Sequence, residues 1–137
     1  MIRVLLVDDH ELLRAGLRSR LEPEPGITVV GEADTAERAV LLARRLQPDL
    51  IVLDLLLPRK SGDEVIPELT EVAPQSRVLV VSSQAAPSSV RRALSAGAAG
   101  YLPKRSSDRD LVAAIQLVAN GGGYVLSTRL PLRGSSG

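Results

Sequence analysis

The stretch IRVLLVDDHELLRAGL, residues 2–17, runs from a strand-like segment into a helix-like segment through two adjacent carboxylates. The segment Ile2–Val7 is mostly apolar and has no regular polar alternation, which is typical of a strand covered on both faces. Asp8 and Asp9 follow it directly, although like charges side by side repel. Taken alone, the pair could be a helix N-cap followed by a first-turn acid. The rest of the chain decides between that interpretation and a cation site.

Short apolar runs alternate with helical patterns along the whole chain, which predicts an α/β fold. The expected architecture is doubly wound, with a parallel sheet between two layers of helices. The strands are expected at Ile2–Val7, Ile27–Gly31, Leu50–Leu53, Val78–Val81 and Gly100–Leu102. The helices are expected at Glu11–Leu21, Thr35–Leu46 with Thr35 as N-cap, Gly62–Val72 with Pro67 shortening or kinking it, Pro87–Ala96 ending at Gly97, and Asp108–Asn120.

Composition excludes several classes of protein. The chain has 137 residues, 17 basic and 16 acidic, so it lacks the strongly basic balance of a nucleic-acid-binding domain. It has no cysteine, which excludes disulfides and thiolate zinc sites. It also lacks an apolar stretch of the roughly 18 residues that a membrane span needs, and a signal peptide before the first strand. We therefore expect a soluble cytoplasmic domain with no membrane partner.

Polar side chains fall at the carboxyl ends of four predicted strands. Asp8 and Asp9 end the first strand, Asp54 the third, Ser82 the fourth, and Lys104 stands at the end of the fifth. Ligands of open parallel sheets bind at this edge, so these residues should converge. Three carboxylates and one ammonium leave negative charge that would recruit a cation, and oxygen ligands favour Mg²⁺ or Mn²⁺.

The same cluster has the parts needed for phosphoryl transfer. A carboxylate beside Mg²⁺ can attack phosphorus and form an aspartyl phosphate, and Asp54 is the best candidate because it lies at the centre of the group. Catalysis of this transfer consists mostly of positioning and charge neutralisation. Lys104 and the Ser82 hydroxyl could supply both.

Four motifs carry a resemblance to a known family. VDDH (7–10), PDLIVLDLLLPRKSG (48–62), VLVVSS (78–83) and AGAAGYLPK (96–104) occur in order and at matching spacings. In these segments the chain resembles a response-regulator receiver domain of the CheY-like type, most like the N-terminal receivers of NarL/LuxR-type transcriptional regulators. The resemblance covers residues 1–120 and implies a flavodoxin-like (βα)5 three-layer sandwich with strand order 2-1-3-4-5. We expect residues 121–137 to be a linker or a tail left by expression.

The resemblance also implies how the site works. Asp54 would accept a phosphoryl group from the phosphohistidine of a sensor histidine kinase. Asp9 would bind Mg²⁺ directly, Asp8 mostly through water, and the backbone carbonyl of Leu56 would be a further ligand, alongside Asp54. The domain would be a signalling switch rather than an enzyme with a separate substrate, because it would catalyse only its own phosphorylation and dephosphorylation.

The switch itself is assigned by the same resemblance. Lys104 would pair with the phosphoryl group, Ser82 would turn toward it, and Tyr101 would swing inward as space opens. This movement would remodel one face of the domain and favour a homodimer. DNA would be contacted only through a helix-turn-helix domain, which the sequence does not contain.

Three other functions fit parts of the sequence. A flavodoxin-like cofactor module would share the sheet, but two carboxylates after the first strand would repel a flavin phosphate. A Mg²⁺-dependent phosphohydrolase would need a substrate pocket beyond five βα units. A degenerate receiver that only dimerises would not need the complete set of site residues.

Three features lie outside these assignments. Leu56 stands where the family often has a polar residue, so we expect slow hydrolysis of the phosphorylated form. We interpret His10 as a surface residue, although its place beside the acid pair also suits a metal role. Segment Leu111–Ala119 has Gln116 as its one polar residue, so the helix either tolerates exposed alanines or buries a second face in a partner.

Overall fold

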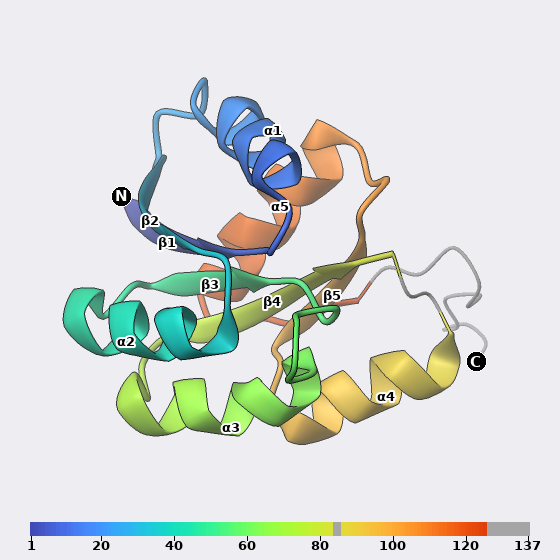
Figure 1. Ribbon diagram of the computed structural model, residues 1–137. Coiled ribbons are helices and arrows are strands. Elements are labelled where there is room, and N and C mark those ends of the chain that lie inside the picture. The colour runs from blue at the N-terminus through green and yellow to red at the C-terminus, as the bar shows by residue number, and fades with distance from the viewer. Residues whose placement is uncertain (84–85, 126–137) are drawn as a thin grey trace.

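The computed structural model describes residues 1–83 and 86–125, which form a three-layer α/β sandwich (Figure 1). All neighbouring strands are parallel, in the order β2-β1-β3-β4-β5-β6. The expected order of the first five strands is therefore confirmed, and the structure adds a sixth. The strands are β1 (Ile2–Val7), β2 (Ile27–Ala33), β3 (Leu50–Leu53), β4 (Arg77–Ser82), β5 (Gly100–Pro103) and β6 (Tyr124–Val125).

Helices cover both faces of the sheet. Figure 1 shows α2, α3 and α4 below the sheet and α1 and α5 above it. The helices are α1 (Glu11–Leu21), α2 (Ala36–Leu46), α3 (Gly62–Val72), α4 (Pro87–Ala96) and α5 (Asp108–Ala119). None of the described helices is long and apolar enough to cross a membrane.

The sheet separates two hydrophobic cores, because alternate strand residues point to opposite faces. In β1, for example, Leu5 and Val7 belong to the core beneath α2, α3 and α4. Val4 and Leu6 belong to the core beneath α1 and α5. This two-sided burial explains why the central strands are apolar at successive positions rather than at every second one.

Element boundaries agree with the predicted ones to within two residues, and helix capping explains two of them. The Thr35 side chain accepts a hydrogen bond from the backbone amide of Arg38, so Thr35 caps α2 as expected and the helix proper begins at Ala36. Gly97 ends α4 with a φ of 121°, a conformation that favours glycine. Of the two effects expected of Pro67, shortening does not occur, since α3 continues through it to Val72 as predicted, and a kink stays a prediction.

The sixth strand lies in the segment that we expected to be a linker or tail. Tyr124 pairs with Gly100 and Val125 with Tyr101, so the chain after α5 returns to the edge of the sheet. Two residues leave too short an apolar pattern to be read as a strand from sequence. The rest of the expected tail, residues 126–137, lies outside the described part of the chain, and the domain boundary at 120 stays a prediction.

A glycine positions the loop that follows β3. The Gly62 amide donates to the Leu55 carbonyl oxygen at 2.8 Å, which closes the loop. A β-carbon on Gly62 would lie 2.7 Å from the Leu55 α-carbon and 3.3 Å from the Asp54 carbonyl oxygen. Since backbone atoms cannot rotate away, a larger residue must shift the loop.

We predict that Gly62→Ala lowers the free energy of unfolding by about 1–3 kcal/mol, the usual cost of overpacking. Gly16→Ala is the matched control, because Gly16 lies within α1 and its β-carbon would meet no atom within 4 Å. That control should gain up to about 1 kcal/mol of helix stability. Urea denaturation of both variants tests the pair, and equal midpoints for Gly62→Ala and the parent would contradict the prediction.

Candidate functional site

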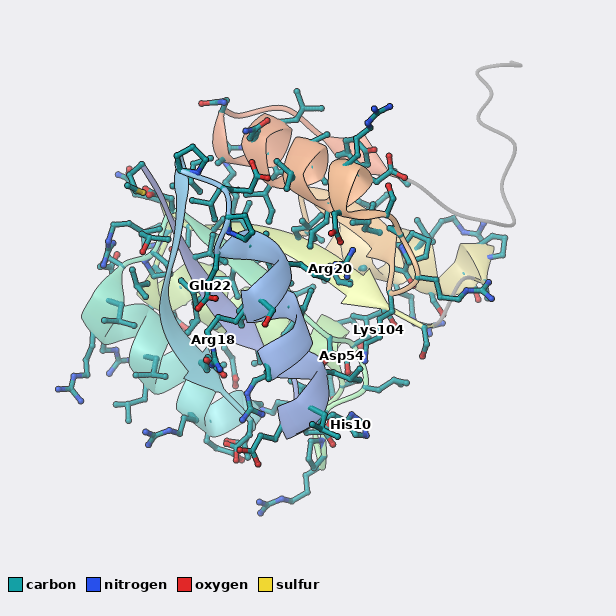
Figure 2. The ribbon with its side chains drawn as sticks, turned by 90° about the horizontal axis from the view of Figure 1, so that it is seen from above. His10, Arg18, Arg20, Glu22, Asp54 and Lys104 are labelled. Carbon is teal, nitrogen blue, oxygen red and sulfur yellow. The ribbon has the colours of Figure 1, made fainter. Side chains whose placement is uncertain are left out.

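The polar residues predicted at the strand ends meet at one edge of the sheet. The Lys104 ammonium lies 3.0 Å from Asp54 Oδ2 and 3.3 Å from Asp8 Oδ2. Asp54 and Asp8 are each 2% exposed, so both are almost entirely removed from water. Figure 2 looks down on the sandwich and shows Asp54 beside Lys104, with His10 at the start of α1. The predicted convergence of these residues is what the structure shows.

Hydrogen bonds that involve the main chain hold Asp54 and Asp8 in place. The Asp54 amide donates to the Val7 carbonyl oxygen at 3.0 Å, which aligns the ends of β1 and β3. The Leu56 amide in turn donates to Asp54 Oδ1 at 3.1 Å. Asp8 Oδ1 accepts from the His10 amide at 2.9 Å, and the Asp8 carbonyl oxygen accepts from the Arg14 guanidinium at 2.6 Å. Each carboxylate is therefore fixed by the main chain that follows it.

Burial decides the protonation behaviour of the central carboxyl group. Desolvation raises the pKa of Asp54 above its usual value, although the Leu56 amide and the Lys104 ammonium act in the opposite direction. Burial by itself would lower the pKa of Lys104, but its hydrogen bond and ion pair with Asp54, helped by Asp8, raise it. The Lys104 ammonium therefore only partly offsets the free energy that desolvation of the carboxylates costs at this edge of the sheet.

The acidic group fits a divalent cation. Asp8, Asp9 and Asp54, together with His10, each offer a ligand atom, and these atoms all lie within 4.8 Å of one another. Asp9 Oδ1 is buried and accepts no hydrogen bond from the described residues, which is costly unless another group binds it. Oxygen donors of this kind suit Mg²⁺ or Mn²⁺. The predicted metal residues Asp8, Asp9 and Asp54 are thus suitably placed. The backbone carbonyl of Leu56 as a further ligand stays a prediction.

The two predicted switch residues lie together on the neighbouring strands. Ser82 at the end of β4 and Tyr101 in β5 are both fully buried, and their side chains are hydrogen bonded to each other. Burial raises the pKa of Tyr101, while the hydrogen bond with Ser82 lowers it. The Lys104 amide donates to the Ser82 carbonyl oxygen at 3.0 Å and connects this pair to the acidic group.

Tyr101 occupies an inward position, with its side chain 0% exposed. This position both buries the ring and gives its hydroxyl a partner in Ser82. The expected movement of Tyr101 on phosphorylation stays a prediction.

Sequence reasoning missed two positioning residues. Gly62 allows the loop after Asp54 to close, and the only signal for it was its place at the end of the PDLIVLDLLLPRKSG motif. Arg14 binds the Asp8 carbonyl oxygen, and its Nε also lies 3.2 Å from Glu32 Oε1 on β2. An arginine on an amphipathic helix carries no sequence signal for such a role.

Comparison with known proteins identifies the family of this chain. The sequence model of the response regulator receiver domain matches residues 4–116. The nitrate/nitrite response regulator protein NarL of Escherichia coli (strain K12) is 42% identical over 118 residues, which are 86% of this chain and 55% of that protein. The transcriptional regulatory protein DegU of Brevibacillus brevis is 36% identical over 124 residues, which are 90% of this chain and 52% of that protein.

Solved structures give the same result. A two-component response regulator of the LuxR family from Aurantimonas sp. SI85-9A1 superposes with a TM-score of 0.87 at 35% identity, covering 93% of this chain and 91% of that one. The chain spans about half the length of the curated relatives it matches. Since the family match covers most of the chain, the protein belongs to the response regulator receiver domain family of two-component systems.

Proposed function

We propose that Asp54 accepts a phosphoryl group from the phosphohistidine of a sensor histidine kinase and that this modification switches the domain. The observation that carries the proposal is the contact of one ammonium with two buried carboxylates, Lys104 with Asp54 at 3.0 Å and with Asp8 at 3.3 Å. This arrangement places a fixed positive charge beside the oxygen atoms where a transferred phosphoryl group would add negative charge. We place this activity in the cytoplasm.

The transfer requires little of the protein beyond positioning. An Asp54 carboxylate oxygen forms a bond to phosphorus while the bond from phosphorus to the histidine nitrogen breaks, and the imidazole leaves with the electron pair. The Leu56 amide holds Asp54 Oδ1, so Oδ2, on the side of Lys104, is the natural nucleophile. Asp8, Asp9 and Asp54 would hold Mg²⁺, with the Leu56 carbonyl as a further ligand. When bound, Mg²⁺ would neutralise charge between the carboxylates and the phosphoryl oxygens.

The conformational change that we propose follows from the hydrogen-bond donors that a phosphoryl group on Asp54 would attract. It adds about −1.5 to −2 charge and three acceptor oxygens. The Lys104 ammonium already lies 3.0 Å from Asp54 Oδ2, and Ser82 stands at the end of β4, the strand that pairs with β3. A conformation in which both donors face the phosphoryl group is favoured, and the hydrogen bond of Ser82 with Tyr101 carries the change into β5. We propose that this shift promotes a homodimer and controls an effector, with DNA contacted through a helix-turn-helix domain of a longer protein.

We predict that the parent gains one phosphoryl group, measured by intact mass, after incubation with Mg²⁺ and acetyl phosphate, and that Asp54→Asn gains none. Asp34→Asn is the matched control, because Asp34 is an exposed carboxylate and should leave phosphorylation unchanged. Omission of Mg²⁺ should also abolish the addition. A phosphorylated Asp54→Asn variant, or an unmodified parent in the presence of Mg²⁺, would contradict the proposal.

The lifetime of the phosphorylated form depends on Leu56. Its side chain is 47% exposed and lies two residues after Asp54, where it would cover the approach of a hydrolytic water. We predict that Leu56→Asn speeds loss of the phosphoryl group, because an amide can bind and orient that water. Intact mass followed over time after removal of acetyl phosphate measures the rate, with Leu56→Met as an apolar control of similar size. An Asn variant no faster than the parent would refute the role.

The raised pKa of Asp54 predicts a cost in stability. Above that pKa the parent holds a buried carboxylate, so Asp54→Asn should raise the free energy of unfolding without Mg²⁺ by about 1 kcal/mol, or the melting temperature by about 4 °C. In the folded state the pKa of Asp54 is raised from 3.8, so the parent regains stability as the pH falls through that folded pKa. The difference in the free energy of unfolding between Asp54→Asn and the parent should therefore narrow as the pH falls toward 3.8. Calorimetry in a chelator measures both effects. An Asn variant that melts below the parent at neutral pH would disprove the cost.

A further inference from the structure

The one histidine of the chain, His10, lies against the carboxylates rather than out in solvent alone. Its Nδ1 is 3.1 Å from Asp9 Oδ1 and 3.4 Å from Asp8 Oδ1, although 63% of the side chain is exposed. It is also one of the four residues whose ligand atoms lie within 4.8 Å of one another. His10 is thus a surface residue, as expected, whose Nδ1 atom also lies beside the acidic pair.

Helix capping does not account for the position of the ring. His10 is the N-cap residue of α1, but its side chain makes no capping hydrogen bond. The backbone amide, not the ring, donates to Asp8 Oδ1 at 2.9 Å. Asp9 Oδ1 lies at ion-pair distance from Nδ1, 3.1 Å, but accepts no hydrogen bond from the described residues, and a neutral imidazole would carry no charge to offset the carboxylate. His10 Nδ1 and Asp9 Oδ1 thus lie close together without a hydrogen bond between them, and a metal ion could bind both.

The spacing of these atoms is that of neighbouring ligands around one ion. For ligands at about 2.1 Å from an octahedral ion, adjacent donor atoms are about 3.0 Å apart and opposite ones about 4.2 Å. The separation of 3.1 Å between Nδ1 and Asp9 Oδ1 matches the first value. The ligand atoms of all four residues lie within 4.8 Å of one another, which is compatible with the 4.2 Å expected between opposite ligands. One ion could therefore contact the imidazole and the carboxylates together.

We propose that His10 Nδ1 is a metal ligand and that it makes this site bind imidazole-accepting divalent ions, such as Co²⁺ and Zn²⁺, more tightly than Mg²⁺. Mg²⁺ is a hard ion that prefers oxygen ligands, so it gains little from Nδ1. First-row transition ions accept imidazole readily and gain a ligand that carboxylates alone do not offer. The inference rests on the proposed function, because it uses the same acidic site.

Calorimetric titration of the metal-free full chain with Co²⁺ and with Mg²⁺ tests the preference. We expect the parent to bind Co²⁺ more tightly than Mg²⁺. His10→Ala should weaken Co²⁺ binding about 10-fold or more and leave Mg²⁺ binding unchanged. The fold should tolerate this variant, since the ring makes no capping bond and the backbone amide is retained. Glu11→Gln, which removes an exposed charge next to His10, is the control for a purely electrostatic effect and should not alter the preference.

Nitrogen NMR gives a second, independent measurement, because a chain with one histidine has one imidazole to observe. Zn²⁺ is a suitable diamagnetic probe, since it also accepts imidazole. We expect Zn²⁺ to shift the Nδ1 resonance much more than the Nε2 resonance, and Mg²⁺ to shift neither strongly. Asp9→Asn should abolish the Zn²⁺ shift, because the imidazole and Asp9 would bind the same ion.

The possible outcomes separate this inference from the proposed function. If His10→Ala binds Co²⁺ as tightly as the parent, or if Zn²⁺ shifts Nε2 instead of Nδ1, the inference is wrong, while Mg²⁺ binding and phosphorylation of Asp54 are unaffected. If the parent binds neither Co²⁺ nor Mg²⁺, the inference fails together with the metal site of the proposed function. Tighter Co²⁺ binding that disappears in His10→Ala supports it.

Discussion

The functional edge of this domain depends on one electrostatic balance. Three carboxylates gather at the end of a parallel sheet, and a single ammonium, that of Lys104, lies between two of them. The balance is incomplete: the pKa of Asp54 is raised by burial even with Lys104 3.0 Å away, and Asp9 Oδ1 is buried without a hydrogen bond from the described residues. The remaining negative charge is what makes a divalent cation, and then a phosphoryl group, chemically appropriate here.

Strand register is what brings these charges together. Val7 pairs with Leu53, and Leu53 pairs with Val80, so β1, β3 and β4 end at nearly the same level. The carboxylates follow Val7 and Leu53 directly along the chain. Register is strongly specified because a slip of one residue would exchange the two cores on the two faces of the sheet. The apolar strand residues therefore fix the position of the polar ones, and core packing and site geometry are one constraint.

The same logic explains what could be predicted from sequence. Each polar residue at a strand end was predictable, because a buried strand is visible as an apolar run and its end is visible as the first charge. The position of Tyr101 was predictable but not its rotamer, which depends on core packing and on a hydrogen bond made by the tertiary structure. Gly62 and the ring of His10 needed three-dimensional contacts, and the strand Tyr124–Val125 was too short to produce a pattern. Local periodicity thus identifies elements and their ends, whereas side-chain direction comes from packing.

The inward position of Tyr101 bears on how a switch of this kind could work. A hydroxyl has one donor and two acceptor positions, so Ser82 can donate to a phosphoryl oxygen and still accept from Tyr101. The hydrogen bond between the two side chains can then be kept while Ser82 also binds the phosphoryl group. A hydrogen bond to a charged group contributes about 1.5–3 kcal/mol, enough to change a conformational ratio by about 10-fold to 100-fold. Under the proposed function, phosphorylation would act by increasing the share of conformations in which Ser82 faces the phosphoryl group and Tyr101 stays buried.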